Sequence, residues 1–188
     1  GFSKNKEEII IYDEFDVWKL DLNGDYILKC TEGRIDNLTA RYALDTRLGI
    51  NQFTQFLFNV PLIDTSELIL KQRNKMNFET SLIRIDQFGK KTTIMPATLH
   101  RILNVKKLES QKYLILKENH QTPPKYEVYD QKGKMLAKYQ TNTQYLQYKW
   151  GSTKLFNIKL KDGYMTQASL IYPFDWDPAK KYPMVVYY

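Results

Sequence analysis

The sequence predicts a nearly all-β protein, because one strand-and-turn pattern recurs along the chain and helical periodicity is scarce. Composition supports this class. Among 188 residues there are 14 tyrosines, and aromatic residues make up 14%, a bias that suits half-buried pleated surfaces. Hydrophobic residues reach 43%, enough to build a core, which excludes wholesale disorder.

The recurring unit consists of an apolar strand, a polar stretch, an alternating strand and an Asp-x-x-Gly turn. Its three copies cover residues 9–24, 68–89 and 114–133. We expect the first two strands of each copy to pair antiparallel, with residues 68–70 and 114–116 as equivalent strands. The aspartate supplies a side-chain acceptor and the glycine a positive φ, so the Asp-x-x-Gly should turn the chain into the next strand.

The spacing of the copies is typical of propeller blades. Gly89 and Gly133 lie 44 residues apart, within the range of about 40–50 residues expected for a four-stranded blade. Gly24 and Gly89 lie 65 residues apart, which places an insertion of roughly twenty residues in segment 34–61. Segment 97–103 is expected to continue the second unit, and 136–148 to finish the third. Three blades are too few to close a ring, so open blade faces are expected. Similar strand patterns also occur in β-sandwiches and meanders, which stay open as alternatives.

Charge and side-chain inventory argue against several functions. The net charge is +7, but basic and acidic residues are interspersed, which indicates a solvated surface and no nucleic-acid interface. Cys30 is the single cysteine, and His100 and His120 have no metal-ligand spacing, so neither a disulfide nor a metal or other cofactor is expected. The sequence contains no apolar run of about 18 residues, the length needed to span a membrane.

The pattern changes near residues 149–153, which predicts a boundary between a domain at 1–150 and another at 151–188. Segments 154–160 and 165–172 should pair as a hairpin around Asp162 and Gly163. A proline-bracketed loop follows at 173–183, and the apolar run 184–188 reads as a strand buried on both faces. The chain starts without methionine and stops on this apolar run, so we expect it to be a piece of a longer protein.

Three strings of the tail carry a family resemblance. FNIKLKDG (156–163), LIYPFDWDPAKKYP (170–183) and VVYY (185–188) resemble the start of the hydrolase domain in prolyl oligopeptidase family serine peptidases. Upstream, DVWKLD (16–21) and NLT (37–39) resemble blade sequences of dipeptidyl-peptidase-like members. The resemblance implies a β-propeller fragment of about three blades, followed by the first strands of an α/β-hydrolase (peptidase) domain.

For function, the resemblance implies proteolysis by the whole enzyme, a serine-type exo- or oligopeptidase with a Ser-His-Asp triad whose propeller gates substrate access. The triad is expected outside this chain, because none of its serines stands in a Gly-x-Ser-x-Gly elbow. These serines are Ser3, Ser66, Ser81, Ser110, Ser152 and Ser169. The catalytic set of this chain is therefore expected to be empty, and the chain alone to have no peptidase activity. The family's oxyanion tyrosine aligns just beyond Tyr188, which takes that role only if the alignment slips by one residue.

The resemblance also sets expectations about partners and location. We expect a peptide substrate for the whole enzyme, a homodimer, and export to the periplasm or the extracellular space. Glu7 and Glu8 read as a solvated pair and not as a site for a peptide amino terminus. Dipeptidyl and endo cleavage both stay open. The alternative function is a propeller-type protein- or ligand-binding module without enzymatic activity, which would not need a buried strand after the Asp-Pro loop.

Overall fold

The computed structural model describes residues 1–5, 7–44, 62–140 and 142–187. Within these residues the protein is nearly all β, with strands β1 to β15 and two single-turn 3-10 helices, η1 (Glu109–Gln111) and η2 (Gln144–Gln147). None of the described helices is long and apolar enough to cross a membrane. The chain divides into two compact units. Gly1–Asn119 and Pro124–Thr141 form the first unit, and His120–Pro123 and Asn142–Tyr188 form the second.

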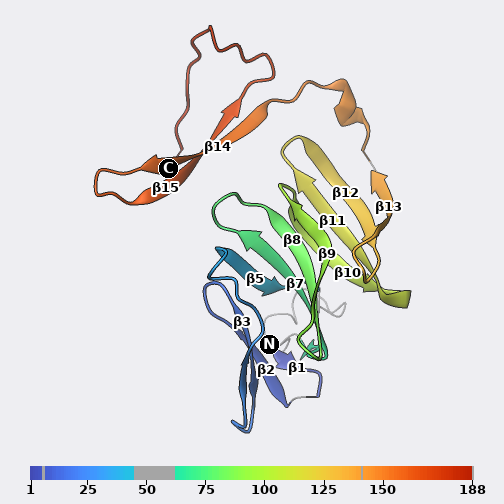
Figure 1. The fold of residues 1–188 in the computed structure, drawn as a ribbon. Helices are drawn as coiled ribbons and strands as arrows, with labels where there is room; N and C mark the ends of the chain where they lie inside the picture. The colour runs from blue at the N-terminus through green and yellow to red at the C-terminus, as the bar shows by residue number, and fades with distance from the viewer. Residues whose placement is uncertain (6, 45–61, 141, 188) are drawn as a thin grey trace, which may run out of the picture. The chain divides into compact units, whose positions relative to one another are not determined.

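The first unit contains three sheets, each with four strands in chain order (Figure 1). The first sheet is β1 (Phe2–Ser3), β2 (Glu8–Tyr12), β3 (Val17–Asp21) and β4 (Ile27–Lys29), with β6 (Leu62–Ile63) added parallel to β1. The second sheet is β5 (Leu38–Tyr42), β7 (Glu67–Asn74), β8 (Thr80–Asp86) and β9 (Lys91–Thr98). The third sheet is β10 (Arg101–Leu108), β11 (Lys112–Asn119), β12 (Thr122–Tyr129) and β13 (Met135–Gln140). The predicted all-β, propeller-like arrangement is confirmed, and the sheets do not close into a ring.

The Asp-x-x-Gly turns join the third strand of each sheet to the fourth, as predicted. In the second sheet, Asp86 Oδ1 accepts hydrogen bonds from the backbone nitrogens of Phe88 and Lys90 at 3.0 and 2.9 Å. Gly89 then turns the chain with a φ of +81°, a left-handed conformation that glycine adopts without strain. The equivalent glycines, Gly24 and Gly133, have φ values of +87° and +85°. The shared turn chemistry explains why the repeat was visible in the sequence.

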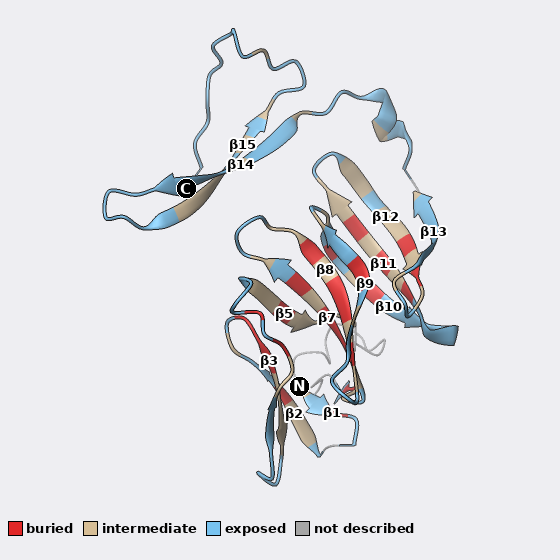
Figure 2. Ribbon diagram, in the orientation of Figure 1, coloured by how far each residue is buried: buried red, intermediate tan, exposed pale blue. Residues whose placement is uncertain are grey.

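The second sheet is covered on both faces, as the apolar run of β7 shows. Leu68 and Leu70 point to one face and are buried with residues of the first sheet, whereas Ile69 points to the other face and is buried with residues of the third. This alternation follows from the two-residue period of a strand. The partners of Leu68 and Leu70 include Ile10 and Val17, and those of Ile69 include Ile102, Val105, Tyr113 and Ile115. Figure 2 shows the resulting concentration of buried residues on β7 and β8.

The blade boundary after β9 differs from the prediction. Segment 97–103 was expected to continue the second unit, but the chain leaves the second sheet at Thr98 and enters the third at Arg101. There β10 pairs with β11, with Ile102 opposite Lys117. The prediction was wrong because Ile102 is buried in the core between the second and third sheets, and its apolar character fits either sheet.

Two further segments differ from the predicted strands. Residues 143–148 were expected to finish the third blade as a strand, but 144–147 form η2. The Asn142 side chain accepts a hydrogen bond from the Gln144 backbone nitrogen at 3.0 Å, and such local bonds compete with strand pairing. The expected insertion at 34–61 begins with β5, the first strand of the second sheet. Its remainder at 45–61 lies outside the described residues.

The second unit contains the predicted hairpin. β14 (Ser152–Lys159) pairs antiparallel with β15 (Met165–Tyr172) in continuous register, from Ser152 opposite Tyr172 to Lys159 opposite Met165. Gly163 turns the chain with a φ of +87°.

The apolar run that follows does not form the predicted strand. Residues 184–187 have no assigned strand, and Val185 and Tyr187 are 96% and 100% exposed. A strand of this kind needs cover on both faces, and none of the described residues provides it. The last residue of the run, Tyr188, lies outside the described part of the chain.

Candidate functional site

The two histidines, for which no metal-binding role was expected, lie in different units: His100 in the first and His120 in the second. His100 Nδ1 is hydrogen-bonded to Thr98 Oγ1 at 2.8 Å, and His120 Nε2 to Thr153 Oγ1 at 3.0 Å. Among the described residues, each histidine therefore contacts a threonine hydroxyl and not a serine. Tyr188, the oxyanion candidate, lies beyond the part of the chain that the structure describes.

The lone cysteine and the amino-terminal acidic pair have structural surroundings. Cys30 is half-buried, and burial raises the pKa of its thiol, which keeps it protonated and unreactive. Glu8 was expected to be solvated, but its side chain is only 13% exposed and forms an ion pair with Lys19 at 3.2 Å. It also accepts a hydrogen bond from the Tyr26 hydroxyl. Glu8 is not solvated because the antiparallel pairing of β2 and β3 brings its side chain next to that of Lys19. No cluster of three or more potential metal ligands occurs among the described residues.

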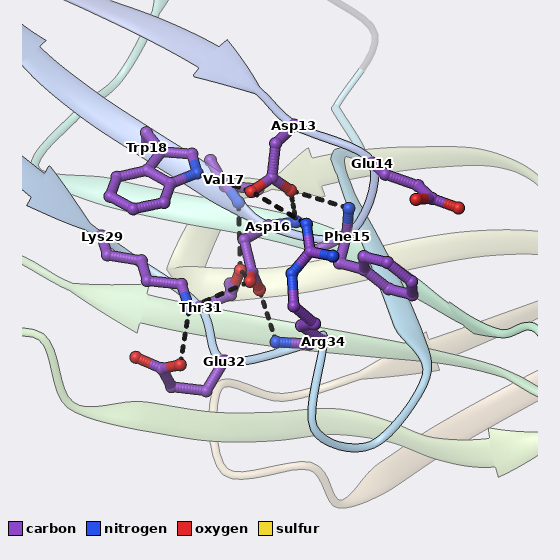
Figure 3. Close-up of polar contacts among 12 residues, drawn as sticks. Asp13, Glu14, Phe15, Asp16, Val17, Trp18, Lys29, Thr31, Glu32 and Arg34 are labelled. Atoms are coloured by element: carbon purple, nitrogen blue, oxygen red, sulfur yellow. Dashed lines mark hydrogen bonds and ion pairs between the residues drawn. The ribbon is translucent and has the colours of Figure 1, made fainter.

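The most completely buried carboxylate of the first sheet is Asp16, drawn with its neighbours in Figure 3. Its side chain is 0% exposed and lies 3.1 Å from the Lys29 ammonium. Asp16 Oδ1 accepts hydrogen bonds from Thr31 Oγ1 at 2.8 Å and from the Gly33 backbone nitrogen. Thr31 Oγ1 in turn accepts a bond from the Val17 backbone nitrogen at 3.0 Å. The carboxylate therefore fastens the loop that follows β4 to the start of β3.

Glycine is required where this loop approaches the carboxylate. A Cβ atom at Gly33 would lie 2.1 Å from the Leu38 carbonyl oxygen and 3.1 Å from Asp16 Oδ1, so any side chain would force the loop away. Burial raises the pKa of Asp16, but the donors on Thr31, Gly33 and Lys29 outweigh it and hold the pKa below its usual range. Asp16 is thus a charged structural anchor, with Oδ1 hydrogen-bonded within the chain and Oδ2 facing only the Lys29 ammonium.

The turn before β3 is held by a second carboxylate, Asp13. Its Oδ1 accepts hydrogen bonds from the backbone nitrogens of Phe15 and Asp16 at 2.7 and 2.6 Å, and its Oδ2 accepts one from Trp18 Nε1 at 3.2 Å. Figure 3 shows Asp13 above Asp16, with the Arg34 guanidinium directed at Asp13 at 3.9 Å. The string DVWKLD therefore has a physical role: its first residue and the aspartate upstream fix how β3 begins.

A third carboxylate, only partly exposed, connects the second and third sheets. Glu67, on β7, accepts hydrogen bonds from Arg84 Nε at 2.6 Å and from the Tyr113 hydroxyl at 3.2 Å. It also forms an ion pair with Lys107 on β10. Since Arg84 lies in the second sheet and Lys107 and Tyr113 lie in the third, this cluster is an ionic cross-link between two blades.

A fourth carboxylate, Glu127, lies within the third sheet. Its side chain is 7% exposed and contacts the Lys117 ammonium at 2.6 Å and the Tyr129 hydroxyl at 2.7 Å. Lys125 approaches its other oxygen at 3.4 Å. Burial and the positive charges of Lys125 and Lys117 lower the pKa of His100, so this histidine stays neutral near pH 7.

Sequence reasoning missed these carboxylates, although one signal was available. When the Asp-x-x-Gly turns are aligned, Glu127 and Tyr129 fall at the positions of Ile83 and Ile85, which are buried. An acidic residue at a core position of a repeat must be paired, and the alignment would have predicted a cation beside Glu127.

The second unit is held by aromatic and backbone contacts in its proline-bracketed loop. The Tyr182 hydroxyl accepts a hydrogen bond from the Asp177 backbone nitrogen at 2.9 Å and donates one to the Asp175 carbonyl at 3.2 Å. The rings of Tyr172 and Trp176 lie 4.5 Å apart. Tyr182 thereby closes the Asp-Pro…Lys-Lys-Tyr-Pro loop on itself.

Comparison with known proteins supports the fold. No family model matches the sequence, and no curated protein sequence matches it. Solved structures match the fold with high probability. Porphyromonas gingivalis dipeptidyl peptidase 4 gives a TM-score of 0.65 at 18% identity, over 97% of this chain and 24% of that one. AtxE2 isopeptidase gives 0.58 with Astexin3-dC4 bound and 0.57 in the apo form, each at 13% identity over 97% of this chain and 25% of that one.

These similarities show the fold: the chain has a propeller-type β fold like that of part of these two peptidase structures, and it spans about a quarter of the length of the proteins it matches.

Proposed function

We propose that this chain is the non-catalytic propeller part of a serine peptidase of the prolyl oligopeptidase family, dipeptidyl-peptidase-like, and that residues from 151 onward begin its α/β-hydrolase domain. One observation carries the proposal: three stacked sheets, one of five strands and two of four, are followed by an exposed hairpin and a closed Asp-Pro…Lys-Lys-Tyr-Pro loop. The proposal includes a Ser-His-Asp site beyond this chain, a peptide substrate, a homodimer and export from the cytoplasm.

The outer face of the third sheet supports further blades. Tyr126 pairs with Tyr139, and Val128 pairs with Ala137, on the face turned away from the second sheet. In the aligned repeat Tyr126 corresponds to Leu82, which is buried between the second and third sheets. The third sheet therefore presents apolar side chains where its neighbour makes a blade contact, and we propose that another blade covers them.

The ionic cross-link at Glu67 supports a gating role. Blades of a propeller surround a central channel, and a channel excludes large substrates only while its blades stay together. Glu67 binds cations of both the second and third sheets. This cluster would hold neighbouring blades against separation.

A serine-directed probe tests the proposal. We expect a fluorophosphonate to label the protein made from the complete reading frame, at a serine that follows Tyr188. The 188-residue chain should stay unlabelled and should not hydrolyse Gly-Pro or Ala-Ala chromogenic peptides. An unlabelled full-length protein would favour the alternative, a binding module. Labelling of the 188-residue chain would place the nucleophile within it and overturn the proposal.

A substitution tests gating in the labelled protein. Glu67→Gln removes the charge that connects the blades, so hydrolysis of a peptide of about 30 residues should rise several-fold while hydrolysis of a short chromogenic substrate stays constant. Glu109→Gln, at an exposed carboxylate in η1, is the matched control. Equal changes for both substrate lengths would mean that the propeller does not sieve.

A further inference from the structure

A polar groove lies between the first and second sheets, beside the loop that follows β4. Its volume is about 200 Å³. Residues of segment 29–36 form one wall, and the second sheet contributes Leu38, Gln72 and Lys91 to the other. Gln72 faces the first sheet because it lies two residues after Leu70 on β7, and Leu70 is buried with residues of the first sheet. We call this space the inter-sheet groove.

The inter-sheet groove is elongated along the strands. Gln72 lies opposite Ser81 on β8, whereas Lys91 lies opposite Ile85 on the same strand. Ser81 and Ile85 are four residues apart, which is about 13 Å at a rise of about 3.3 Å per residue. That distance is roughly the length of an extended peptide of three or four residues. Lys91 therefore stands at one end of the groove and Gln72 at the other.

The two ends carry opposite charges. Asp36 lies at the Gln72 end, since its carbonyl oxygen accepts a hydrogen bond from Asn74 Nδ2 at 3.4 Å, and Asn74 follows Gln72 by two residues on β7. Asp36 and Lys91 are both exposed and line the groove. One end of the inter-sheet groove thus offers a carboxylate and the other an ammonium group.

The loop wall is held in place by contacts within the chain. Lys29 forms ion pairs with Asp16 at 3.1 Å and with Glu32 at 2.7 Å, and Figure 3 shows its ammonium between the two carboxylates. The Gly33 backbone nitrogen donates to Asp16. A wall fixed in this way is formed before any ligand arrives, which lowers the entropy cost of binding.

Gln72 places an amide group beside the groove. Its residue is only 4% exposed, and its Oε1 accepts a hydrogen bond from Ser81 Oγ at 3.5 Å. The amide nitrogen carries two donors, and the oxygen has a second lone pair. Such a group matches a peptide bond, which has one carbonyl acceptor and one N–H donor.

We propose that the inter-sheet groove binds a short peptide with both termini free, its amino terminus at Asp36 and its carboxylate at Lys91. The opposite charges at the two ends fix the direction of the peptide, and Gln72 hydrogen-bonds a peptide group near its amino end. The chemistry of this ligand follows from the groove alone. That such peptides reach the groove as products of proteolysis rests on the proposed function.

The length of the groove distinguishes a peptide from a free amino acid. An amino acid carries the same two charges within one residue, so it can reach Asp36 or Lys91 but not both. A peptide of three residues spans about 10 Å when extended, and the flexible side chain of Lys91 covers the remainder. Trialanine is therefore the probe, because it has both charges and small side chains.

Equilibrium dialysis of isotope-labelled trialanine tests the assignment. The protein is made from the complete reading frame and treated with the fluorophosphonate, so that a reactive serine is blocked and the peptide stays intact. We expect trialanine to bind about fivefold more tightly than its N-acetylated form or its C-amidated form, because each lacks one charge. Free alanine should bind at least about tenfold more weakly than trialanine.

Substitutions at the two ends should depend on which terminus is free. Asp36→Asn should weaken trialanine and its C-amidated form about fivefold and leave the N-acetylated form unchanged, because that form has no ammonium. Lys91→Gln should weaken trialanine and the N-acetylated form and leave the C-amidated form unchanged. Gln72→Leu should weaken every form by about threefold. The controls Asp25→Asn and Lys90→Gln, exposed and outside the groove, should change binding by less than about twofold.

Dependence on the free terminus is the result that a structural effect cannot produce, since a damaged fold would weaken every peptide form alike. Equal losses for all forms in the Asp36 and Lys91 variants would overturn the assignment, as would equal losses in the controls. Absence of binding at about 10 mM trialanine would mean that the groove holds only water. Alanine binding as tightly as trialanine would assign the groove to free amino acids and overturn the peptide.

These outcomes are distinct from failure of the proposed function. The proposed function is decided by whether the fluorophosphonate labels the full-length protein, whereas the groove is decided by dialysis of the same protein. A labelled protein without terminus-dependent binding removes only this inference. An unlabelled protein with such binding keeps the groove and makes the chain part of a binding module.

Discussion

The Lys117 ammonium and the Glu127 carboxylate lie 2.6 Å apart in the third sheet, and each side chain is only 7% exposed. Burial raises the pKa of Glu127, but the hydrogen bonds from Lys117 and Tyr129 outweigh it and leave the pKa below its usual range. Each charge is therefore tolerated in the core because the other is present. Removing either one should be far more damaging than removing both.

Glu127→Ala should destabilise the chain by about 3–5 kcal/mol, because Lys117 would stay buried without its partner. Lys117→Met combined with Glu127→Leu should recover most of that loss. Urea unfolding followed by tyrosine and tryptophan fluorescence measures both. Lys125→Gln, which removes the more exposed cation of the cluster, is the control and should cost below about 1 kcal/mol. A Glu127→Ala loss no larger than that of the control would contradict the account.

Acid should weaken the first sheet through Asp16. Its pKa is held below the value of an unfolded aspartate, so its contribution to stability is complete above about pH 4 and is lost as pH falls through the folded pKa. Asp16→Asn should lower stability at pH 7 by about 1–3 kcal/mol and make the urea midpoint less sensitive to pH between 5 and 3. Parallel pH curves for the two proteins would show that Asp16 does not supply this dependence.

Gly133→Ala and Gly24→Ala form a matched pair that separates backbone strain from steric overlap. Both glycines have positive φ, +85° and +87°, so alanine should cost each about 1 kcal/mol. A Cβ atom at Gly133 would also lie 2.4 Å from the Thr93 carbonyl oxygen, whereas at Gly24 nothing lies within 4 Å. We therefore expect Gly133→Ala to cost roughly 1–3 kcal/mol more. Equal urea midpoints for the two variants would refute the contact.

Amide hydrogen-exchange rates should differ sharply between the first unit and the second. The hairpin of β14 and β15 is a two-stranded sheet with largely exposed side chains, and such hairpins are marginal in water. Val185 and Val186 have no strand partner. In the dilute monomer both valines should exchange at nearly unprotected rates and β14 soon after, while Leu70 and Ile83 exchange slowest. Slow exchange of Val185 would show that its strand is satisfied within this chain and would favour the self-contained module.

Much of the fold followed from local signals. Alternation of apolar residues placed most strands, and the Asp-x-x-Gly turns placed the junctions between them, because both signals act within a few residues. The assignment of β10 failed because alternation gives the face of Ile102 and does not specify which sheet the strand joins. The strand predicted at the end of the chain is absent from 184–187 for a related reason. An apolar run shows that its side chains need to be buried, but only other parts of a fold can bury them.

The polar clusters were harder to predict than the strands. Glu67 is the clearest case, because its partners Lys107 and Tyr113 follow it by forty residues or more. Such pairings depend on register between sheets, which the local pattern does not contain.

Because the second sheet is covered on both faces, the three sheets should not open with equal ease. In a linear array each repeat is stabilised by its own strands and by the interfaces with its neighbours. The second sheet takes part in two interfaces and each flanking sheet in one. Thermal opening should therefore begin in the flanking sheets and reach β7 and β8 last, so the energy that resists blade separation is concentrated at the middle of the array.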